Sequence, residues 1–304
     1  MSQRSRQRLA TDAEKLFAAS QLWQRHNEIL ESGHSHNVLT EAVYSYMHDA
    51  GESHHEDYMR AFFRSKVQDI GALLPRVHDI VRRSSYEVTQ SLQENLPQAN
   101  DIVLALLQSA TDYRGFNLRV YGIELPLIEP WTSQPQVIDI VSHLFDVTFR
   151  LVESPSSTTT SAATFPTLST LRGQLPDLAG VLFTAYAEWC AWLGSPLAAS
   201  DPSHARAQAE FDERFKQARP VVLDTLRRAG FIDHTFALAE RYRDYRSLAA
   251  LCHSEREKVY PPEANPYRRR IWQYVEKFRD QFAEEMCAWY IEHGVCLWRC
   301  CFVK

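Results

Sequence analysis

Residues 236–252 read FALAERYRDYRSLAALC, and this stretch decides the fold class. Its apolar and aromatic side chains recur three and four positions apart, which places them on one face of a helix. They are Leu238, Tyr242, Tyr245, Leu248 and Leu251. Glutamate and arginine occupy the other faces. A helix with one apolar face needs neighbouring helices to cover that face, so the stretch predicts a stack of helices.

The composition supports the same fold class for the whole chain. The sequence has 304 residues, of which 45% are hydrophobic, and this is enough to bury a sizeable core. Only 10 residues are glycine, and Leu, Ala, Glu, Arg and Gln dominate the periodic segments, which favours helix over strand. No fixed sequence period supports a regular repeat family. We predict an all-α fold, an irregular α-solenoid-like array of stacked helices.

Charge and hydropathy argue against several classes of protein. The net charge of -5 and the pI near 6.2 lack the basic footprint of nucleic-acid binding. The longest wholly apolar run, residues 102–107, is much shorter than the roughly 20 residues that span a bilayer. The basic N-terminus lacks the apolar core of a secretory signal, and we expect the six cysteines to be reduced. These features predict a soluble protein of the cytosol or nucleus.

A shift in composition divides the chain. Residues 154–170 are rich in Ser, Thr and Pro and have neither charge nor helical periodicity, so we expect a disordered loop there. We expect one helical unit at residues 1–153 and a second at 171–294 that continues the same stack. Residues 295–304 form an atypical Cys-rich tail.

Individual residues predict where helices begin. Asn37 is expected to cap the helix that follows it, and Thr132 or Ser133 another. Pro97 and Pro220 are each expected to mark the start of a new helix, because proline breaks the hydrogen bonding of a helix interior. Two further helices are expected close to the C-terminus, over 267–278 and 281–293.

Four histidines provide an alternative hypothesis, a metal-dependent helical enzyme. His34, His36, His54 and His55 lie in two predicted loops, the second of which also holds acidic residues; imidazole and carboxylate together suit a metal ion. Their spacing matches no single-helix metal template. The three cysteines of the tail also lack the paired spacing of a closed zinc site. We predict no bound metal and no cofactor.

Sequence motifs for catalysis are missing. The chain has no Gly-x-x-x-x-Gly-Lys phosphate loop, no Gly-x-Gly-x-x-Gly fingerprint and no Gly-x-Ser-x-Gly elbow. The adjacent carboxylates Glu284 and Glu285 point to different faces of a helix and cannot converge on a substrate. We therefore predict no catalytic residues and no enzymatic activity.

The block at 238–252 also carries a family resemblance. Together with Tyr274-x-x-x-Phe278, FAEEM at 282–286 and WYIEHG at 289–294, it resembles the C-terminal helical domain of the nucleoporin 133 family. Weaker similarity extends upstream, so that the resemblance covers most of residues 10–294. The motif residues, expected to serve packing or an interface, are Leu238, Ala239, Glu240, Tyr242, Asp244, Tyr245, Leu248, Cys252, Tyr274, Phe278, Phe282, Trp289 and Tyr290.

The resemblance implies a structural component of the nuclear pore complex at the nuclear envelope. Such a component would support nucleocytoplasmic transport, including mRNA export and protein import, through contacts with other scaffold nucleoporins of the Y-shaped subcomplex. Family members bind nucleoporin 107 through their last helices, and this sequence departs from the pattern after Gly294, so we expect that binding end to be missing. We expect no direct membrane or nucleic-acid contact. A vesicle-coat type of helical adaptor is a further alternative with the same physical pattern.

Overall fold

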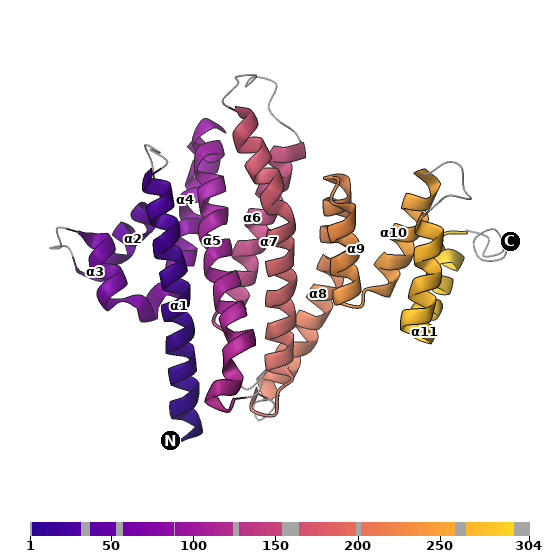
Figure 1. Cartoon of the computed structure of the whole chain (residues 1–304), viewed down its shortest axis with the longest axis horizontal. Helices are drawn as coiled ribbons and strands as arrows, with labels where there is room; N and C mark the ends of the chain where they lie inside the picture. The colour runs from indigo at the N-terminus through magenta and orange to yellow at the C-terminus, as the bar shows by residue number, and fades with distance from the viewer. Residues whose placement is uncertain are drawn as a thin grey trace. The chain divides into compact units, whose positions relative to one another are not determined.

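We describe the fold from a computed structural model, which describes residues 2–31, 37–52, 57–87, 89–123, 128–153, 164–198, 202–258 and 266–294. In these ranges every regular element is a helix, which confirms the predicted all-α fold class. None of the helices there is both long enough and apolar enough to cross a bilayer. Figure 1 shows the helices in chain order, coloured from indigo at the N-terminus to yellow at the C-terminus.

The chain divides into two compact units, Met1–Phe215 (unit 1) and Lys216–Lys304 (unit 2), and the division falls inside helix α8. The elements before it are α1 Gln3–Glu31, α2 Val38–Asp49, α3 Tyr58–Ser65, the 3-10 helix η1 Val67–Ala72, α4 Leu73–Glu87, α5 Thr89–Asn117, the 3-10 helix η2 Leu118–Tyr121, α6 Pro135–Glu153 and α7 Thr164–Leu193. From there the chain continues as α8 Pro202–Arg228, α9 Ile232–Arg241, α10 Tyr245–Lys258 and α11 Pro266–Glu292. The domain limits expected around residues 154–170 stay a prediction.

Helix α5 is the centre of unit 1. It packs against α1, α4 and α7, and Figure 1 shows it between α1 and α7. Because it has neighbours on several sides, apolar residues are buried on several of its faces, including every residue of the wholly apolar run 102–107 except Ala105. Around this centre α6 packs against α7, and α2 against α4. The helix that holds the longest wholly apolar run of the sequence is therefore one that several other helices surround.

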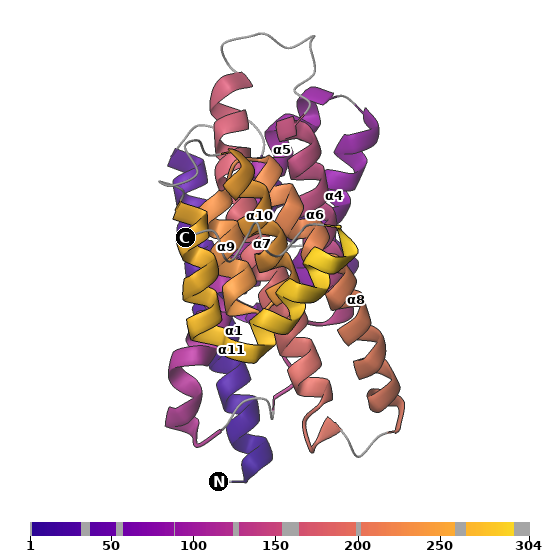
Figure 2. The same ribbon diagram turned by 90° about the vertical axis from the view of Figure 1, so that its right-hand side faces the viewer.

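Unit 2 is built on α10, which packs against α9 and more extensively against α11. Inside α11, Arg279 has φ 51° and ψ -130°, so the helix bends there into two segments. Figure 2 shows this bend in the yellow part of the chain. Separate helices were predicted over 267–278 and 281–293, and the break at residue 279 lies between those two ranges.

The turn between α9 and α10 closes tightly. At the end of α9 the Asp244 amide donates to the Ala239 carbonyl at 2.9 Å, and the Arg243 amide to the Glu240 carbonyl at 3.2 Å. This is a Schellman ending, in which Arg243 has φ 52°. The Asp244 side chain then accepts a hydrogen bond of 3.1 Å from the Ser247 amide and caps α10.

The structure corrects several predicted helix starts. Pro97 and Pro220 lie inside α5 and α8, which run through them. The partly buried carbonyl of Pro97 accepts a hydrogen bond from the Gln174 side chain of α7 at 3.0 Å, so α7 holds α5 from outside at this position. Helix α7 begins at Thr164, inside the segment expected as a loop. Pro166 is compatible with this start, because it lies in the first turn, where the missing N–H of proline breaks no intrahelical bond.

Asn37 caps α2 as predicted. Its side chain accepts a hydrogen bond of 3.0 Å from the amide of Thr40. The same prediction for Thr132 and Ser133 was wrong, because both hydroxyl groups point into the interior of unit 1 and bind charged side chains there. Those side chains form the first of the sites described next.

Candidate functional site

A buried ion-pair network joins four parts of unit 1. Arg114 of α5 reaches both oxygens of Glu14 in α1, with Nη2–Oε1 and Nε–Oε2 distances of 2.8 and 3.1 Å. Its Nη1 lies 2.6 Å from Oε2 of Glu188 in α7. Nη2 also donates to the Thr132 hydroxyl at 2.6 Å, and the Ser133 hydroxyl donates to Glu188 at 2.7 Å. One guanidinium therefore connects α1, α5, α7 and the segment that leads into α6.

The network is almost closed to solvent. The side chains of Arg114, Glu14 and Glu188 are 2%, 3% and 22% exposed. Burial acts to lower the pKa of the Arg114 guanidinium, but the hydrogen bonds and charges of the two glutamates outweigh it and raise the pKa. Charges taken out of water in this way are tolerated only when they are paired and hydrogen-bonded, as they are here. The arrangement holds helices in register and offers no open site to a substrate.

The motif residues predicted from the sequence all lie in unit 2, where they contribute to one packed cluster. Seven of them are buried, namely Leu238, Ala239, Leu248, Cys252, Tyr274, Phe282 and Tyr290. The other six, Glu240, Tyr242, Asp244, Tyr245, Phe278 and Trp289, are half-buried. The half-buried members are the ones that a partner could reach. Their role in an interface stays a prediction.

Glu240 is the charged centre of this motif. The Tyr274 hydroxyl donates to its Oε1 and the Lys277 ammonium to its Oε2, both at 2.7 Å. Burial acts to raise the pKa of the Glu240 carboxyl, but the hydrogen bonds from Lys277 and Tyr274 outweigh it and lower the pKa. Glu240 therefore holds α9 to α11 as an ionised group at neutral pH.

Cys252 is a fully buried member of this cluster. Burial raises the pKa of its thiol to about 12, so the group stays protonated at neutral pH and lacks the thiolate that a nucleophile needs. Tyr274 is held protonated in the same way, because burial and the hydrogen bond to Glu240 raise its pKa. Both groups behave as parts of a core.

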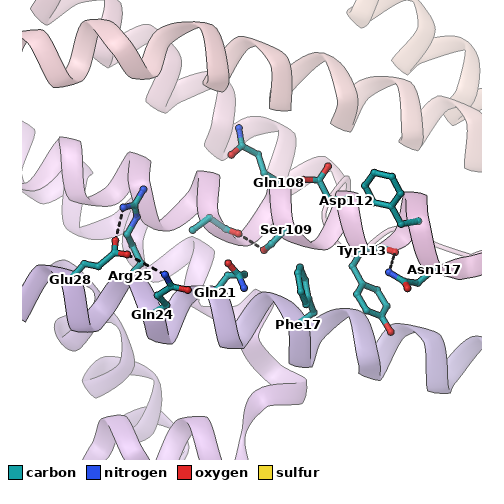
Figure 3. A pocket seen from close by; sticks show the side chains of 12 residues that line it. Phe17, Gln21, Gln24, Arg25, Glu28, Gln108, Ser109, Asp112, Tyr113 and Asn117 are labelled. Atoms are coloured by element: carbon teal, nitrogen blue, oxygen red, sulfur yellow. Dashed lines mark hydrogen bonds and ion pairs between the residues drawn. The ribbon is translucent and has the colours of Figure 1, made fainter.

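A groove of about 740 Å³ runs along the surface of unit 1 between α1 and α5. Figure 3 shows Phe17 and Gln21 from α1 facing Ser109 and Tyr113 from α5. The rings of Phe17 and Tyr113 lie 5.4 Å apart. Phe116, which also lines the groove, is 82% exposed. Aromatic rings and amides together form a surface suited to contact with another chain.

Arg25 and Glu28, two of the charged side chains that line the groove, form an ion pair. Arg25 donates to Glu28 with an Nη1–Oε2 distance of 2.6 Å, and Gln24 also reaches Glu28. Tyr113 donates to or accepts from Tyr121 at 2.8 Å, and this bond together with burial raises its pKa to about 12. The phenol is therefore neutral at physiological pH and cannot act as a base.

The histidines of the alternative hypothesis, His34, His36, His54 and His55, lie outside the described residues, as does the Cys-rich tail. Among the residues that are described, no group of three or more His, Cys, Asp and Glu side chains comes close enough to hold a metal ion. The histidine site therefore stays a prediction, and the structure adds no second metal site of three ligands in its described part.

Comparison with known proteins identifies the family. A family model described as "Non-repetitive/WGA-negative nucleoporin C-terminal" matches residues 8–296. Nucleoporin nup132 of Schizosaccharomyces pombe is 26% identical over 279 residues, which cover 86% of this chain and 23% of that protein. Nucleoporin NUP133 of Chaetomium thermophilum is 24% identical over 242 residues, 70% of this chain and 17% of that protein.

These matches confirm the predicted resemblance to the nucleoporin 133 family. The chain spans about a quarter or less of the length of the two curated relatives. The family and these relatives place the chain in the nuclear pore complex at the nuclear envelope. The family match covers both compact units, from α1 to the end of α11. This chain therefore belongs to the non-repetitive/WGA-negative nucleoporin C-terminal family.

Proposed function

We propose that this chain is a structural scaffold segment of the nuclear pore complex, which supports nucleocytoplasmic transport through protein–protein contacts and catalyses no reaction. The observation that carries the proposal is the family match over residues 8–296 on a chain whose described part is entirely helical. A scaffold needs a rigid interior and outward surfaces for its neighbours. Both needs have a physical counterpart in these helices.

Rigidity is supported by the buried polar contacts of unit 1. The Arg114 network connects segments that are 18 to 100 residues apart in the sequence. A second buried contact joins Asn100 of α5 to Thr148 of α6 and Gln174 of α7, at 2.9 and 3.0 Å. Buried polar groups that are hydrogen-bonded to one another allow few alternative packings of the helices around them.

Docking surfaces are supported by large apolar side chains that remain exposed. Unit 1 exposes Phe116 and Leu16, and unit 2 exposes Trp272 and Ile291. Exposed apolar residues of this size are typical of protein contact surfaces when they gather with polar neighbours. We infer that the partners are other scaffold nucleoporins of the Y-shaped subcomplex.

Imaging tests where the protein is located in the cell. The full-length protein carrying a fluorescent tag should form a punctate ring at the nuclear rim, and purification through the tag should recover other scaffold nucleoporins. A signal on vesicles would instead favour the coat-type adaptor. Stoichiometric metal in the purified protein, found by elemental analysis and lost when His34, His36, His54 and His55 are replaced, would favour the enzyme hypothesis.

Surface variants test the contact mode. Phe116→Glu and Trp272→Glu, each made in the full-length protein, should reduce the recovery of scaffold nucleoporins, while the helix content stays unchanged because both side chains are exposed. Glu276→Gln, an exposed change on α11, serves as the matched control. Full recovery with both aromatic variants would contradict docking through these surfaces.

A further inference from the structure

Two histidines of unit 1 face each other across neighbouring helices. His78 of α4 and His143 of α6 have an Nε2–Nδ1 distance of 3.0 Å. Their ring centroids lie 4.7 Å apart and the ring planes meet at 87°. Both side chains are half-buried, so solvent and small ions can reach the pair. The helices that carry them pack against each other within the same unit.

Both imidazoles are neutral at physiological pH. Burial lowers the pKa of His78, and the neighbouring His143 and Arg82 lower it further. Burial also lowers the pKa of His143, helped by Arg150 and Arg82. The carboxylates of Asp79 and Asp146, one beside each histidine, act in the opposite direction but do not reverse the shift. A neutral imidazole has a lone pair on one ring nitrogen, which is the form that binds metal ions.

The separation of the two nitrogens matches that of two ligands on one ion. An imidazole nitrogen lies about 2.0–2.1 Å from a bound zinc ion, so two such nitrogens at tetrahedral or right angles about one ion are about 2.9–3.4 Å apart. The observed 3.0 Å falls within this range. Without a metal, one ring must instead donate its N–H to the other, and a suitable change of tautomer frees both lone pairs.

We propose that His78 and His143 form a two-ligand site for a divalent transition-metal ion of the imidazole-binding class, such as Zn²⁺, Ni²⁺ or Cu²⁺. No third His, Cys, Asp or Glu completes a set of three in the described part of the chain, so water occupies the other coordination positions. Asp79 and Asp146 lie near the pair, but Arg82 and Arg150 act against them, so the two imidazoles themselves supply the affinity for the ion. Bound there, the ion links α4 to α6 and stabilises unit 1.

A calorimetric titration of the full chain with Ni²⁺ under reducing conditions tests the site. Nickel is chosen because thiolates in general favour zinc, and the chain has six cysteines. His34, His36, His54 and His55 are replaced by Ala in the background protein so that they cannot compete. One saturable ion per chain is expected, and His78→Ala or His143→Ala should each weaken its binding about tenfold or more.

Matched variants make the outcome decisive. His234→Ala, an exposed histidine of unit 2, should leave the binding unchanged. His143→Gln keeps a polar side chain of similar length and serves if the alanine variant loses helix content by circular dichroism. Nickel should raise the melting temperature of the background protein but not of His143→Gln, and the rise should vanish on acidification as protons displace the ion. Equal binding by the background protein and by the variants at 78 and 143, or no saturable binding at all, would overturn the proposal.

Discussion

Unit 1 buries a charged side chain that ties distant parts of the chain together, whereas Glu240, the charged centre of the motif in unit 2, lies closer to the surface. Arg114 is 2% exposed, and its carboxylate partners are 100 and 74 residues away in the sequence. Glu240 is half-buried and meets Tyr274 and Lys277, only 34 and 37 residues away. Because Glu240 is only half-buried and its partners are closer in the sequence, its contacts are easier to form and to replace than those of Arg114.

This difference indicates which interactions stabilise each unit. Removing one partner of a buried ion pair leaves an uncompensated charge and costs several kcal/mol, whereas an exposed pair contributes about 0–1 kcal/mol. Unit 1 therefore relies on one electrostatic centre, in addition to its apolar core. The motif of unit 2 relies on the packing of aliphatic and aromatic side chains, and its half-buried Glu240 pair contributes less.

The largest effect is expected at the centre of unit 1. Arg114→Met should lower the free energy of unfolding of unit 1 by about 3–5 kcal/mol, because Glu14 is left buried without a counter-charge. Urea unfolding followed by hydrogen exchange in α1 and α5 measures the loss. Lys277→Met in unit 2 is the matched control and should cost about 1 kcal/mol or less. Similar costs for the two variants would remove the contrast between the units.

A core substitution tests the apolar dependence of unit 2. Leu248→Ala should destabilise unit 2 by about 3 kcal/mol, because Leu248 is fully buried and the change leaves a cavity under α9 and α11. Hydrogen exchange of α10 amides reports the change within this unit. Replacing the exposed Ala237 of α9 by Ser should have little effect. A cost below about 1 kcal/mol at Leu248 would show that the cluster is loosely packed.

A smaller effect is expected from the hydrogen bond between α9 and α11. Tyr274→Phe removes the hydroxyl that donates to Glu240 and should cost about 1 kcal/mol. The pKa of Glu240 should rise, because one of the two hydrogen bonds that lower it is lost. An NMR titration of the carboxyl group measures this shift. An unchanged pKa would mean that Lys277 alone sets it.

The smallest effect has the opposite sign. Arg243 adopts a left-handed conformation with φ 52° at the end of α9, and glycine adopts it without steric cost. Arg243→Gly should therefore raise the stability of unit 2 by about 0.5 kcal/mol, seen as a higher melting temperature. Ala237→Gly, inside the same helix, should lower the stability by about 1 kcal/mol. A loss of stability at both positions would show that the Arg243 side chain makes a contact that outweighs its strained backbone.

The contrast between the units also decides how much the sequence could predict. In unit 2, the helices over 236–252 and on either side of residue 279 follow local rules. Apolar residues three and four positions apart were therefore sufficient to predict them. The cap at Asn37 follows the same kind of rule in unit 1. Features of this type need only neighbouring residues in the chain.

The network of unit 1 could not be predicted from local patterns. Glu14, Arg114 and Glu188 lie in three helices, and each looks like an ordinary charged residue in its own segment. A weak signal existed in Glu188, which interrupts an otherwise apolar stretch of α7. The predictions at Pro97 and Pro220 were wrong for a related reason, since the helices continue through positions where the local preference of proline would end them.

The Arg114 network has a consequence for the evolution of this fold. Because losing any one of its charges strands the others in a dry interior, positions 14, 114 and 188 cannot drift independently. A lineage that exchanges the network for aliphatic residues must pass through destabilised intermediates or change several codons together. Substitutions at these three positions should therefore appear in concert among distant descendants, each combination preserving either a balanced charge or none.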